Sequence, residues 1–261
     1  MLNFLFPKKN QKVDLEVYPY FENIEVDIHS HLIPGIDDGS PNISTSIELL
    51  KLMRELGFKK IITTPHISEL YPNNGDTIFD GLIRLKKQMK SELLNIDLTV
   101  AAEYMINDLF EQSLMSEVPL LTLADKYILV EMSHLSEPIN LYRVLSILKS
   151  RGFIPVLAHP ERYRFYSNNL YHFEKLKTYG CLFQMNVLSL IGYYGSSISD
   201  CAKLLIENNL IDFIGSDLHH QRHLEAIKKG MAHEYNLYLI NNYPFKNKEL
   251  FNSSSLSENL P

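Results

Sequence analysis

Two histidines at the end of a short apolar run have the spacing of a metal clamp. Residues 26–28 lead into His29 and His31, and Asp38 follows seven residues after the second histidine. If the run is a β-strand, both imidazoles project to the same side, because side chains alternate along a strand. Two imidazoles with a carboxylate close behind suit a borderline-soft divalent metal. The segment is therefore a candidate metal site.

The same arrangement recurs at the ends of further predicted strands. Apolar runs of strand length cover residues 60–65, 96–102, 127–130, 153–158 and 211–216. The residues that follow them are, in order, His66, Glu103, Glu131, His159 and Asp217, with His219 two residues further on. A seventh run, residues 181–185, is followed by the neutral Asn186. Six of the seven predicted strands thus end in a metal-capable residue, which is hard to attribute to chance.

The segments between these strands have helical periodicity. Apolar stripes predict helices over residues 45–57, 78–93, 141–152, 170–179, 199–208 and 222–232. Thr45 and Glu48 have the spacing of a capping box. Strands that alternate with helices predict an α/β fold with a parallel sheet. Seven such units in about 220 residues fit a closed barrel better than an open sheet, although the pattern is compatible with both. In a barrel, functional residues lie at the carboxyl ends of the strands.

Composition and charge narrow the class of protein. The chain has 25 Lys and Arg against 31 Asp and Glu, a formal net charge of −6, which argues against a broad nucleic-acid-binding surface. It does not exclude a nuclease whose metals supply the positive field. Only two cysteines, Cys181 and Cys201, are present, which favours a reducing, cytoplasmic compartment. The apolar N-terminus is too short for a signal-peptide core, and no run reaches transmembrane length, so no membrane insertion is expected.

The ligand motifs together resemble those of the polymerase and histidinol phosphatase (PHP) superfamily. They are Asp27-Ile28-His29-Ser30-His31, Asp37-Asp38-Gly39, Thr64-Pro65-His66, Ala102-Glu103, Glu131, the block Ala158-His159-Pro160-Glu161-Arg162-Tyr163 and Ser216-Asp217-Leu218-His219. Within the superfamily, the chain is most similar to the manganese-dependent tyrosine-protein phosphatases of bacterial capsule and exopolysaccharide clusters. The resemblance implies a distorted (β/α)₇ barrel of the PHP type, with its active site at the C-terminal ends of the strands.

The resemblance also implies the domain boundaries. The phosphatase domain would cover residues 24–245, after an N-terminal extension of residues 1–23. Residues 246–261 are polar and Ser-rich, and we expect them to form a disordered tail.

Three divalent metal ions are implied by the same resemblance. Manganese is the expected metal, and mixed imidazole and carboxylate ligation is also compatible with iron or zinc. The ligands carried over by motif are His29, His31, Glu103 and Asp217 for the first ion, Glu103 as a bridge with Glu131 and His159 for the second, and Asp38, His66 and His219 for the third. Asp38 fits the family spacing better than its neighbour Asp37, which is the alternative ligand.

Two arginines and a tyrosine complete the expected site. Arg162 matches the arginine of the family, and bidentate guanidinium contacts suit phosphoryl oxygens. Arg222 follows His219 by three residues and is a second candidate for catalysis and substrate binding. Tyr163, next to Arg162, is a candidate for contact with the substrate ring. His134, His220 and His223 either line the mouth of the site or are ordinary surface or capping histidines.

The expected chemistry is hydrolysis of phosphate monoesters by a metal-bound hydroxide. Divalent ions offset the charge of the phosphate dianion and lower the pKa of a bound water. A cysteine-based mechanism is excluded, because the residues six positions after Cys181 and Cys201 are Val187 and Glu207 rather than arginine.

The expected substrate is a phosphotyrosine protein, and the resemblance suggests the tyrosine-rich tail of a membrane-bound bacterial tyrosine kinase of polysaccharide export. The nearest alternative is a small-molecule phosphatase of the same fold, such as one that acts on histidinol phosphate. A PHP nuclease and a metal-stabilised regulatory module are further alternatives. The acidic balance argues against the nuclease, and the full ligand set argues against an idle site.

Overall fold

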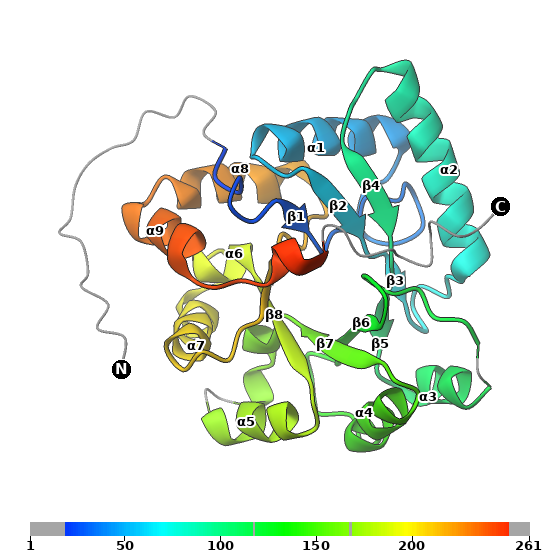
Figure 1. Ribbon diagram of the computed structural model, residues 1–261, viewed down its shortest axis with the longest axis vertical. Coiled ribbons are helices and arrows are strands. Elements are labelled where there is room, and N and C mark those ends of the chain that lie inside the picture. Colours follow the sequence, from blue (N-terminus) through cyan, green and yellow to red (C-terminus); the bar gives the residue numbers. More distant parts are fainter. Residues whose placement is uncertain (1–18, 117, 167–168, 251–261) are drawn as a thin grey trace.

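A computed structural model describes residues 19–116, 118–166 and 169–250 of the chain (Figure 1). Within these residues, every pairing between strands is parallel. One sheet has the order β1-β2-β4 and the other the order β3-β5-β6-β7-β8-β9. The strands are β1 (Val26–Asp27), β2 (Lys60–Thr63), β3 (His66–Ile67), β4 (Asp97–Val100), β5 (Glu103–Met105), β6 (Tyr127–Glu131), β7 (Ile154–Ala158), β8 (Leu182–Asn186) and β9 (Phe213–Gly215).

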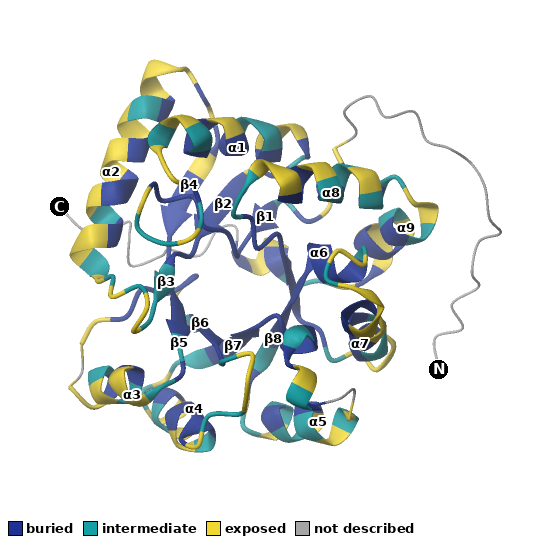
Figure 2. Ribbon diagram, turned by 180° about the vertical axis from the view of Figure 1, so that it is seen from behind, coloured by how far each residue is buried: buried dark blue, intermediate teal, exposed yellow. Residues whose placement is uncertain are grey.

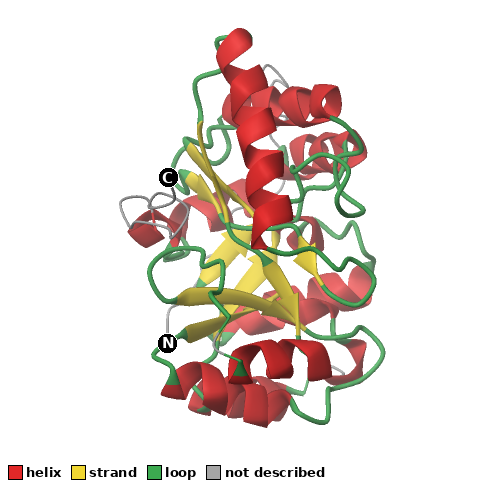
Figure 3. Ribbon diagram, turned by 90° about the vertical axis from the view of Figure 1, so that its right-hand side faces the viewer, coloured by secondary structure: helices red, strands yellow, loops and turns green. Residues whose placement is uncertain are grey.

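Helices lie around the strands (Figures 2 and 3), and the outer faces of these helices are exposed (Figure 2). In α2, for example, Ile78, Leu82, Leu85 and Met89 of the predicted apolar stripe are buried, whereas its last member, Leu93, lies beyond the helix and is exposed. None of the helices in the described ranges is long and apolar enough to cross a membrane. The helices are α1 (Ile43–Glu55), α2 (Gly75–Ser91), α3 (Asp108–Met115), α4 (Leu141–Ser150), α5 (Leu170–Thr178), α6 (Val187–Leu190), α7 (Ser196–Glu207), α8 (Gln221–Met231) and α9 (Glu234–Asn242), with short 3₁₀ turns η1 (Pro160–Arg162), η2 (Arg164–Tyr166) and η3 (Asn247–Leu250).

The predicted α/β alternation is confirmed, with local differences. Two predicted strands are interrupted, one between β2 and β3 and the other between β4 and β5. Hydrogen bonds continue across both breaks, since Ala101 donates its N–H to the Thr63 carbonyl (2.9 Å) and Glu103 donates to the Pro65 carbonyl (3.1 Å). Pro65 has no N–H to give to a ladder, which accounts for the first break. Glu103 therefore begins a short strand, whereas the sequence pattern placed it at the end of one.

The predicted capping box at the start of the first helix is wrong. Asn42 is the N-cap of α1, and its side chain accepts a hydrogen bond from the Thr45 N–H at 3.0 Å. Thr45 is therefore already inside the helix, and Asn42 satisfies the free N–H group that the capping box would have served. The sequence patterns also missed α3, α6 and α9.

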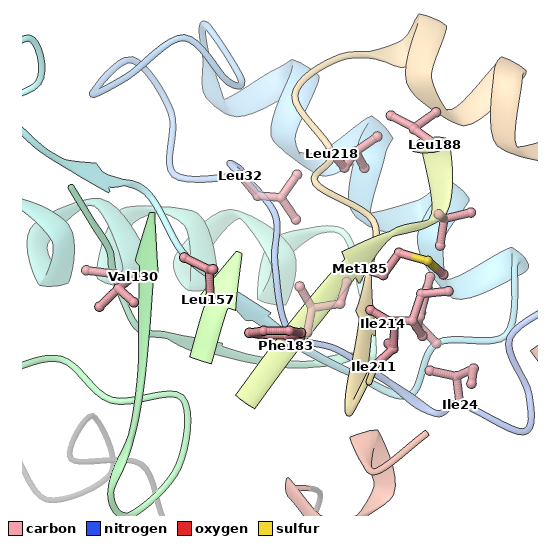
Figure 4. Close-up of a cluster of buried hydrophobic side chains, with 14 of the residues drawn as sticks. Ile24, Leu32, Val130, Leu157, Phe183, Met185, Leu188, Ile211, Ile214 and Leu218 are labelled. Carbon is pink, nitrogen blue, oxygen red and sulfur yellow. The ribbon is translucent and has the colours of Figure 1, made fainter. Parts of the chain in front are cut away.

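Buried side chains of the strands divide between two apolar clusters, because their side chains alternate. Val130 of β6 and Leu157 of β7 belong to the larger cluster, which lies between the strands and the helices (Figure 4). Their neighbours Leu129 and Val156 belong to a smaller cluster. Strands of both sheets supply this smaller cluster, which also contains Val26, Ile62, Leu123, Ala158 and Phe213. The strands are thus buried on both faces, as parallel strands covered by helices are.

The chain segments that follow β1 and β9 lie side by side. A parallel bridge joins Ser30 to Leu218, and Asp217 donates its N–H to the His29 carbonyl at 2.7 Å. The His31 N–H donates to the Leu218 carbonyl at 2.9 Å. These contacts bring the first and the last predicted ligand segments together across almost 190 residues of chain.

The proposed domain boundaries need correction at both ends. Tyr20 and Phe21, placed in the N-terminal extension, are buried in the larger apolar cluster. Residues 247–250, placed in the expected disordered tail, form η3, which contacts the strands. In η3, Asn247 is fully buried, accepts from the Ile214 N–H and donates to the carbonyls of Val26 and Ile214. A single side chain thus joins β1 to β9. Residues 1–18 and 251–261 lie outside the described residues.

Replacing Asn247 with alanine should destabilise the fold. The change removes three hydrogen bonds and leaves buried groups of Val26 and Ile214 unsatisfied, which should lower the free energy of unfolding by roughly 2–4 kcal/mol. Urea denaturation measures this change. Asn241→Ala is the matched control, because its exposed side chain bonds only within α9 and to Asn23. Equal free energies of unfolding for the two variants would show that η3 does not hold β1 against β9.

Candidate metal centre

The structure brings all the predicted metal ligands together in one cluster. Their side-chain atoms form four overlapping groups in which every ligand atom lies within 4.8 Å of the others. The groups are His29, His31 and Asp217; His29, Glu103 and His159; His66, Glu103 and Glu131; and His31, Asp38, His66 and His219. Parallel strands direct their carboxyl ends to one edge, and these residues lie at or just beyond that edge.

Glu103 lies at the centre of the cluster. Its Oε2 is 3.2 Å from His29 Nε2, 3.4 Å from His31 Nε2 and 3.2 Å from His66 Nδ1. Its Oε1 is 3.2 Å from His159 Nε2. Glu103 and Glu131 keep the strand phase of Ala101 and Leu129, two members of the smaller apolar cluster, so that cluster lies beneath the carboxylates.

His66 belongs to two of the four groups, one with Glu103 and Glu131 and the other with Asp38 and His219. Its Nδ1 is 2.9 Å from Glu131 Oε1, and its Nε2 is 3.5 Å from Asp38 Oδ1. The motif resemblance gave this residue only to the ion that Asp38 and His219 would share. The geometry also places it against the glutamate pair, a contact that no motif spacing indicates.

Two ligands at strand ends have left-handed backbone conformations. The φ angle is 37° at His159 and 50° at Asp217. Such angles cost a residue with a Cβ about 1–2 kcal/mol, so the surrounding structure must impose them. The chain turns sharply at each of these two residues, just after the strand ends, and the turn directs the side chain into the cluster. The strain is thus located at two of the predicted metal ligands.

A tight loop decides between the two neighbouring aspartates. Asp37 accepts hydrogen bonds from the His31 ring (2.8 Å) and from the Gly39 N–H (3.0 Å). Asp38 lies 3.5 Å from His66 Nε2 and 3.6 Å from His219 Nε2 and is half exposed. A Cβ at Gly39 would lie 2.2 Å from the His31 carbonyl oxygen, so only glycine allows this loop. Asp38 therefore faces the cluster, while Asp37 orients His31 from behind.

Three histidines are oriented by hydrogen bonds to their Nδ1 atoms. The partners are Gln184 Oε1 for His29 (2.7 Å), Asp37 Oδ2 for His31 (2.8 Å) and the Asp217 carbonyl for His219 (2.9 Å). Each partner is an acceptor, so each ring donates from Nδ1. A neutral ring then has its lone pair on Nε2, which faces the carboxylates of the cluster. This is the usual support for histidines that ligate metals.

The buried carboxylates of the cluster favour positive charge close to them. Burial opposes the charged form of His29, but the carboxylates of Glu103 and Asp217 outweigh it and raise its pKa to about 10. Burial and the neighbouring Glu103 raise the pKa of Glu131 to about 7. The buried Glu103 Oε2 accepts no hydrogen bond in the described part of the chain. Converging carboxylates, correctly oriented imidazoles and this unpartnered oxygen together fit divalent metal ions.

A cavity of about 310 Å³ opens above the cluster. Arg162 lines it, donates from Nη1 to Asp217 Oδ2 at 3.0 Å and lies over the Tyr194 ring at 4.5 Å. The remaining lining residues outside the ligand set are His134, Tyr194, His220 and His223. The three histidines, whose roles the sequence left open, thus belong to the mouth of the site. A guanidinium over metal-capable ligands can bind an anion such as a phosphoryl group.

Two residues expected to contact substrate lie elsewhere. Tyr163 is buried, and its hydroxyl accepts from the Met132 N–H and donates to the Ala158 carbonyl. Its position in the motif reflects packing beneath His159, and Tyr194 supplies the aromatic ring at the cavity instead. Arg222 is exposed in the first turn of α8 and is not among the cavity-lining residues. The structure provides no contact that supports its predicted role.

Sequence reasoning missed Gln184, which bonds to His29. The available signal was a polar residue in the middle of an otherwise apolar strand. The sequence places Asn186 at the end of a strand. Its hydrogen bond to Asp217 Oδ2 at 2.6 Å joins two segments that are distant in the sequence, so no local pattern predicts it.

Comparisons with known proteins show the family of the chain. The family model described as capsular polysaccharide synthesis, CpsB/CapC, matches residues 25–236. The chain belongs to the CpsB/CapC family. CapC of Staphylococcus aureus is 30% identical over 232 residues, which is 88% of this chain and 84% of CapC. The tyrosine-protein phosphatase YwqE of Bacillus subtilis is 34% identical over 199 residues, 74% of this chain and 77% of YwqE.

A solved structure is also similar to this CpsB/CapC chain. It comes from a study of YwqE from Bacillus subtilis and CpsB from Streptococcus pneumoniae, both called metal-dependent tyrosine phosphatases. The TM-score is 0.71 and the sequence identity 29%, over 84% of this chain and 94% of that one. The parallel α/β fold is thus shared with that structure.

Adding Mn²⁺ to chelator-treated protein should raise its melting temperature, because a ligand that binds only the native state stabilises it. At a metal concentration of about 100 times Kd the gain is about 2.7 kcal/mol. Scanning calorimetry with and without Mn²⁺ measures the shift. Glu103→Gln should reduce it, while His172→Ala, which alters a ring stacked on Tyr166, should keep it. Wild-type protein that gains no stability from Mn²⁺, Fe²⁺ or Zn²⁺ would contradict the metal assignment.

Proposed function

We propose that the chain is a metal-dependent protein-tyrosine phosphatase. The observation that carries this proposal is the cavity that Arg162 lines together with a convergent set of imidazoles and carboxylates. The family membership and the named activities of YwqE and CpsB support it. We further propose that the two sheets, which meet between β1 and β9, form the distorted (β/α)₇ barrel of the PHP type.

The proposed centre holds three divalent ions, with manganese as the expected metal. Its ligands are His29, His31, Glu103 and Asp217 for the first ion, Glu103, Glu131 and His159 for the second, and Asp38, His66 and His219 for the third. Bound there, divalent ions would offset the charge of a phosphate dianion and activate water near neutral pH.

The chain's own residues would bind and orient the substrate. A guanidinium has five N–H donors, and the hydrogen bond of Arg162 to Asp217 uses one of them. Its free donors would bind phosphoryl oxygens, while the Tyr194 ring, whose centre is 4.5 Å from the guanidinium carbon, would help to hold the guanidinium in place. The rings of His134, Tyr194 and His220 line the same cavity and would flank the phenyl ring of phosphotyrosine.

The two cysteines support a mechanism without a thiolate. Both are buried and free. Burial raises the pKa of Cys181 to about 12 and that of Cys201 to about 12 as well. Nucleophilic cysteines need a depressed pKa and access to substrate, and neither thiol has them.

The proposed substrate is a phosphotyrosine segment of a tyrosine kinase of polysaccharide export, in the cytoplasm. Capsular polysaccharide synthesis, the description of the family, supports this choice. The alternative substrate is a small phosphate monoester such as histidinol phosphate.

Phosphate release tests the two substrates directly. Metal-stripped protein, reconstituted with Mn²⁺, should hydrolyse a phosphotyrosine peptide in preference to histidinol phosphate and lose this activity on chelation. His159→Ala should reduce turnover to background, because it removes an imidazole 3.2 Å from Glu103. His172→Ala should be active. Preference for histidinol phosphate would move the enzyme to small-molecule metabolism, and activity on neither substrate would refute the proposal.

Arg162→Ala should lower kcat/KM by about 10²–10³-fold, the cost of removing one donor that stabilises developing charge. Arg162→Lys should recover only part of the loss, since an ammonium cannot reproduce the bidentate fork. Arg164→Lys, at an exposed position two residues on, is the matched control. Arg222→Ala should change little if the exposed position of Arg222 reflects its role. Wild-type kcat/KM in Arg162→Ala would remove this residue from the site.

A further inference from the structure

Strand β8 contributes none of the proposed metal ligands, yet it carries two fully buried amide side chains at the site. Gln184 and Asn186 are both 0% exposed. They stand two residues apart in one strand, so they project to the same side. A buried amide must satisfy several donors and acceptors, which makes it costly unless its surroundings are specific.

Hydrogen bonds connect these amides to two proposed ligands of the first ion. Gln184 Oε1 bonds to Nδ1 of His29 at 2.7 Å, and Gln184 Nε2 donates to Asn186 Oδ1 at 2.9 Å. Asn186 Nδ2 donates in turn to Asp217 Oδ2 at 2.6 Å. An unbroken chain of three hydrogen bonds therefore runs from His29 to Asp217.

The direction of this chain is fixed by its end points. Gln184 Nε2 also donates to the Met185 carbonyl at 2.8 Å, so its amide nitrogen faces two acceptors and its oxygen must face His29. Asn186 Oδ1 accepts from Gln184, so its nitrogen must face Asp217, a carboxylate that accepts. Reversing either amide would oppose donor to donor and acceptor to acceptor.

Backbone contacts hold both amides in place. The carbonyl of Gln184 accepts from the His159 N–H at 2.7 Å, and the N–H of Asn186 donates to the buried carboxyl of Glu161 at 3.0 Å. A Cβ at Gly215 would lie 2.7 Å from Gln184 Nε2 and 2.8 Å from the Cβ of His29. Glycine on β9 therefore leaves the space in which Gln184 and His29 meet.

We propose that Gln184 and Asn186 form an amide relay that positions His29 and Asp217 and so sets the affinity for the first metal ion. The proposal rests on the metal centre proposed above. An acceptor at His29 Nδ1 leaves the lone pair on Nε2 for metal. Asn186 and Arg162 both bind Asp217 Oδ2, which leaves Oδ1 facing His29 Nε2 at 3.4 Å. The two amides are positioning residues, not ligands.

Metal affinity, measured without any substrate, tests the relay. The dissociation constant for Mn²⁺ is obtained at fixed pH by competition with a fluorescent chelator, on wild-type protein and on Gln184→Met and Asn186→Ala. Gln184→Met keeps the approximate volume of the side chain and removes both of its polar atoms. We expect each variant to bind the tightest ion about 10–100-fold more weakly, as the loss of outer-shell partners of metal ligands does.

Asn236→Ala is the matched control. Its amide is also buried but donates to the Gly230 carbonyl in the last turn of α8, and it bonds to none of the proposed metal ligands in the described part of the chain. This variant should lose stability without losing Mn²⁺ affinity. Gly215→Ala provides a second approach, because it displaces Gln184 and His29 and removes no polar group. It should weaken Mn²⁺ binding even if Gln184→Met does not fold.

The outcomes separate this inference from the proposed function. Wild-type Mn²⁺ affinity in folded Asn186→Ala and Gly215→Ala would overturn the relay and leave the phosphatase proposal intact. An equal loss of affinity in Asn236→Ala would also overturn it, because the effect would then be general destabilisation. Wild-type protein that binds no divalent metal would overturn both proposals.

Discussion

The buried carboxylate of Glu103 is the constraint on which the rest of the site depends. Its two oxygens lie within 3.4 Å of the imidazole nitrogens of four histidines, which come from three different segments of the chain. Removing an ionised carboxylate from water costs several kcal/mol, and the cost grows when Glu131 and Asp217 converge on the same point. The site is therefore stable only with positive charge at its centre, supplied either by protonated histidines or by metal. The neighbouring carboxylates raise the pKa of His29, His66 and His219, three of the proposed metal ligands.

The fold must bring the first strand, β1, next to the last strand, β9, to build this centre. His29 and His31 follow the first strand, and Asp217 and His219 follow the last, so their contact depends on the junction of β1 with β9. Backbone hydrogen bonds join the two segments beside the predicted ligands. The side chain of Asn247 joins the same two strands closer to their starts, at Val26 and Ile214. Stability and ligand geometry are thus linked through one junction, because any slip of β1 along β9 displaces ligands from both.

That the predicted ligands lie together could be expected from the sequence, because each one follows a local pattern. A short apolar run that ends in His, Asp or Glu identifies the strand end, and parallel strands place their ends at one edge. Other features depend on contacts between distant segments. Asp38 faces the cluster because Gly39 packs on His31, Tyr194 rather than Tyr163 faces the cavity, and Asn247 in the supposed tail joins β1 to β9. No pattern within a single segment contains this information.

Strand β8 shows why a neutral residue type suits the position behind the ligands. A carboxylate in place of Gln184 would also accept from His29 Nδ1, but it would add negative charge to a cluster that already holds Asp38, Glu103, Glu131 and Asp217. It would also lose the donor that fixes Asn186. An amide supplies one acceptor and two donors at no net charge, so it can orient a histidine on one side and a carboxylate on the other. The Gln184–Asn186 pair can therefore orient its two neighbours without adding to the charge that the proposed metal ions would balance.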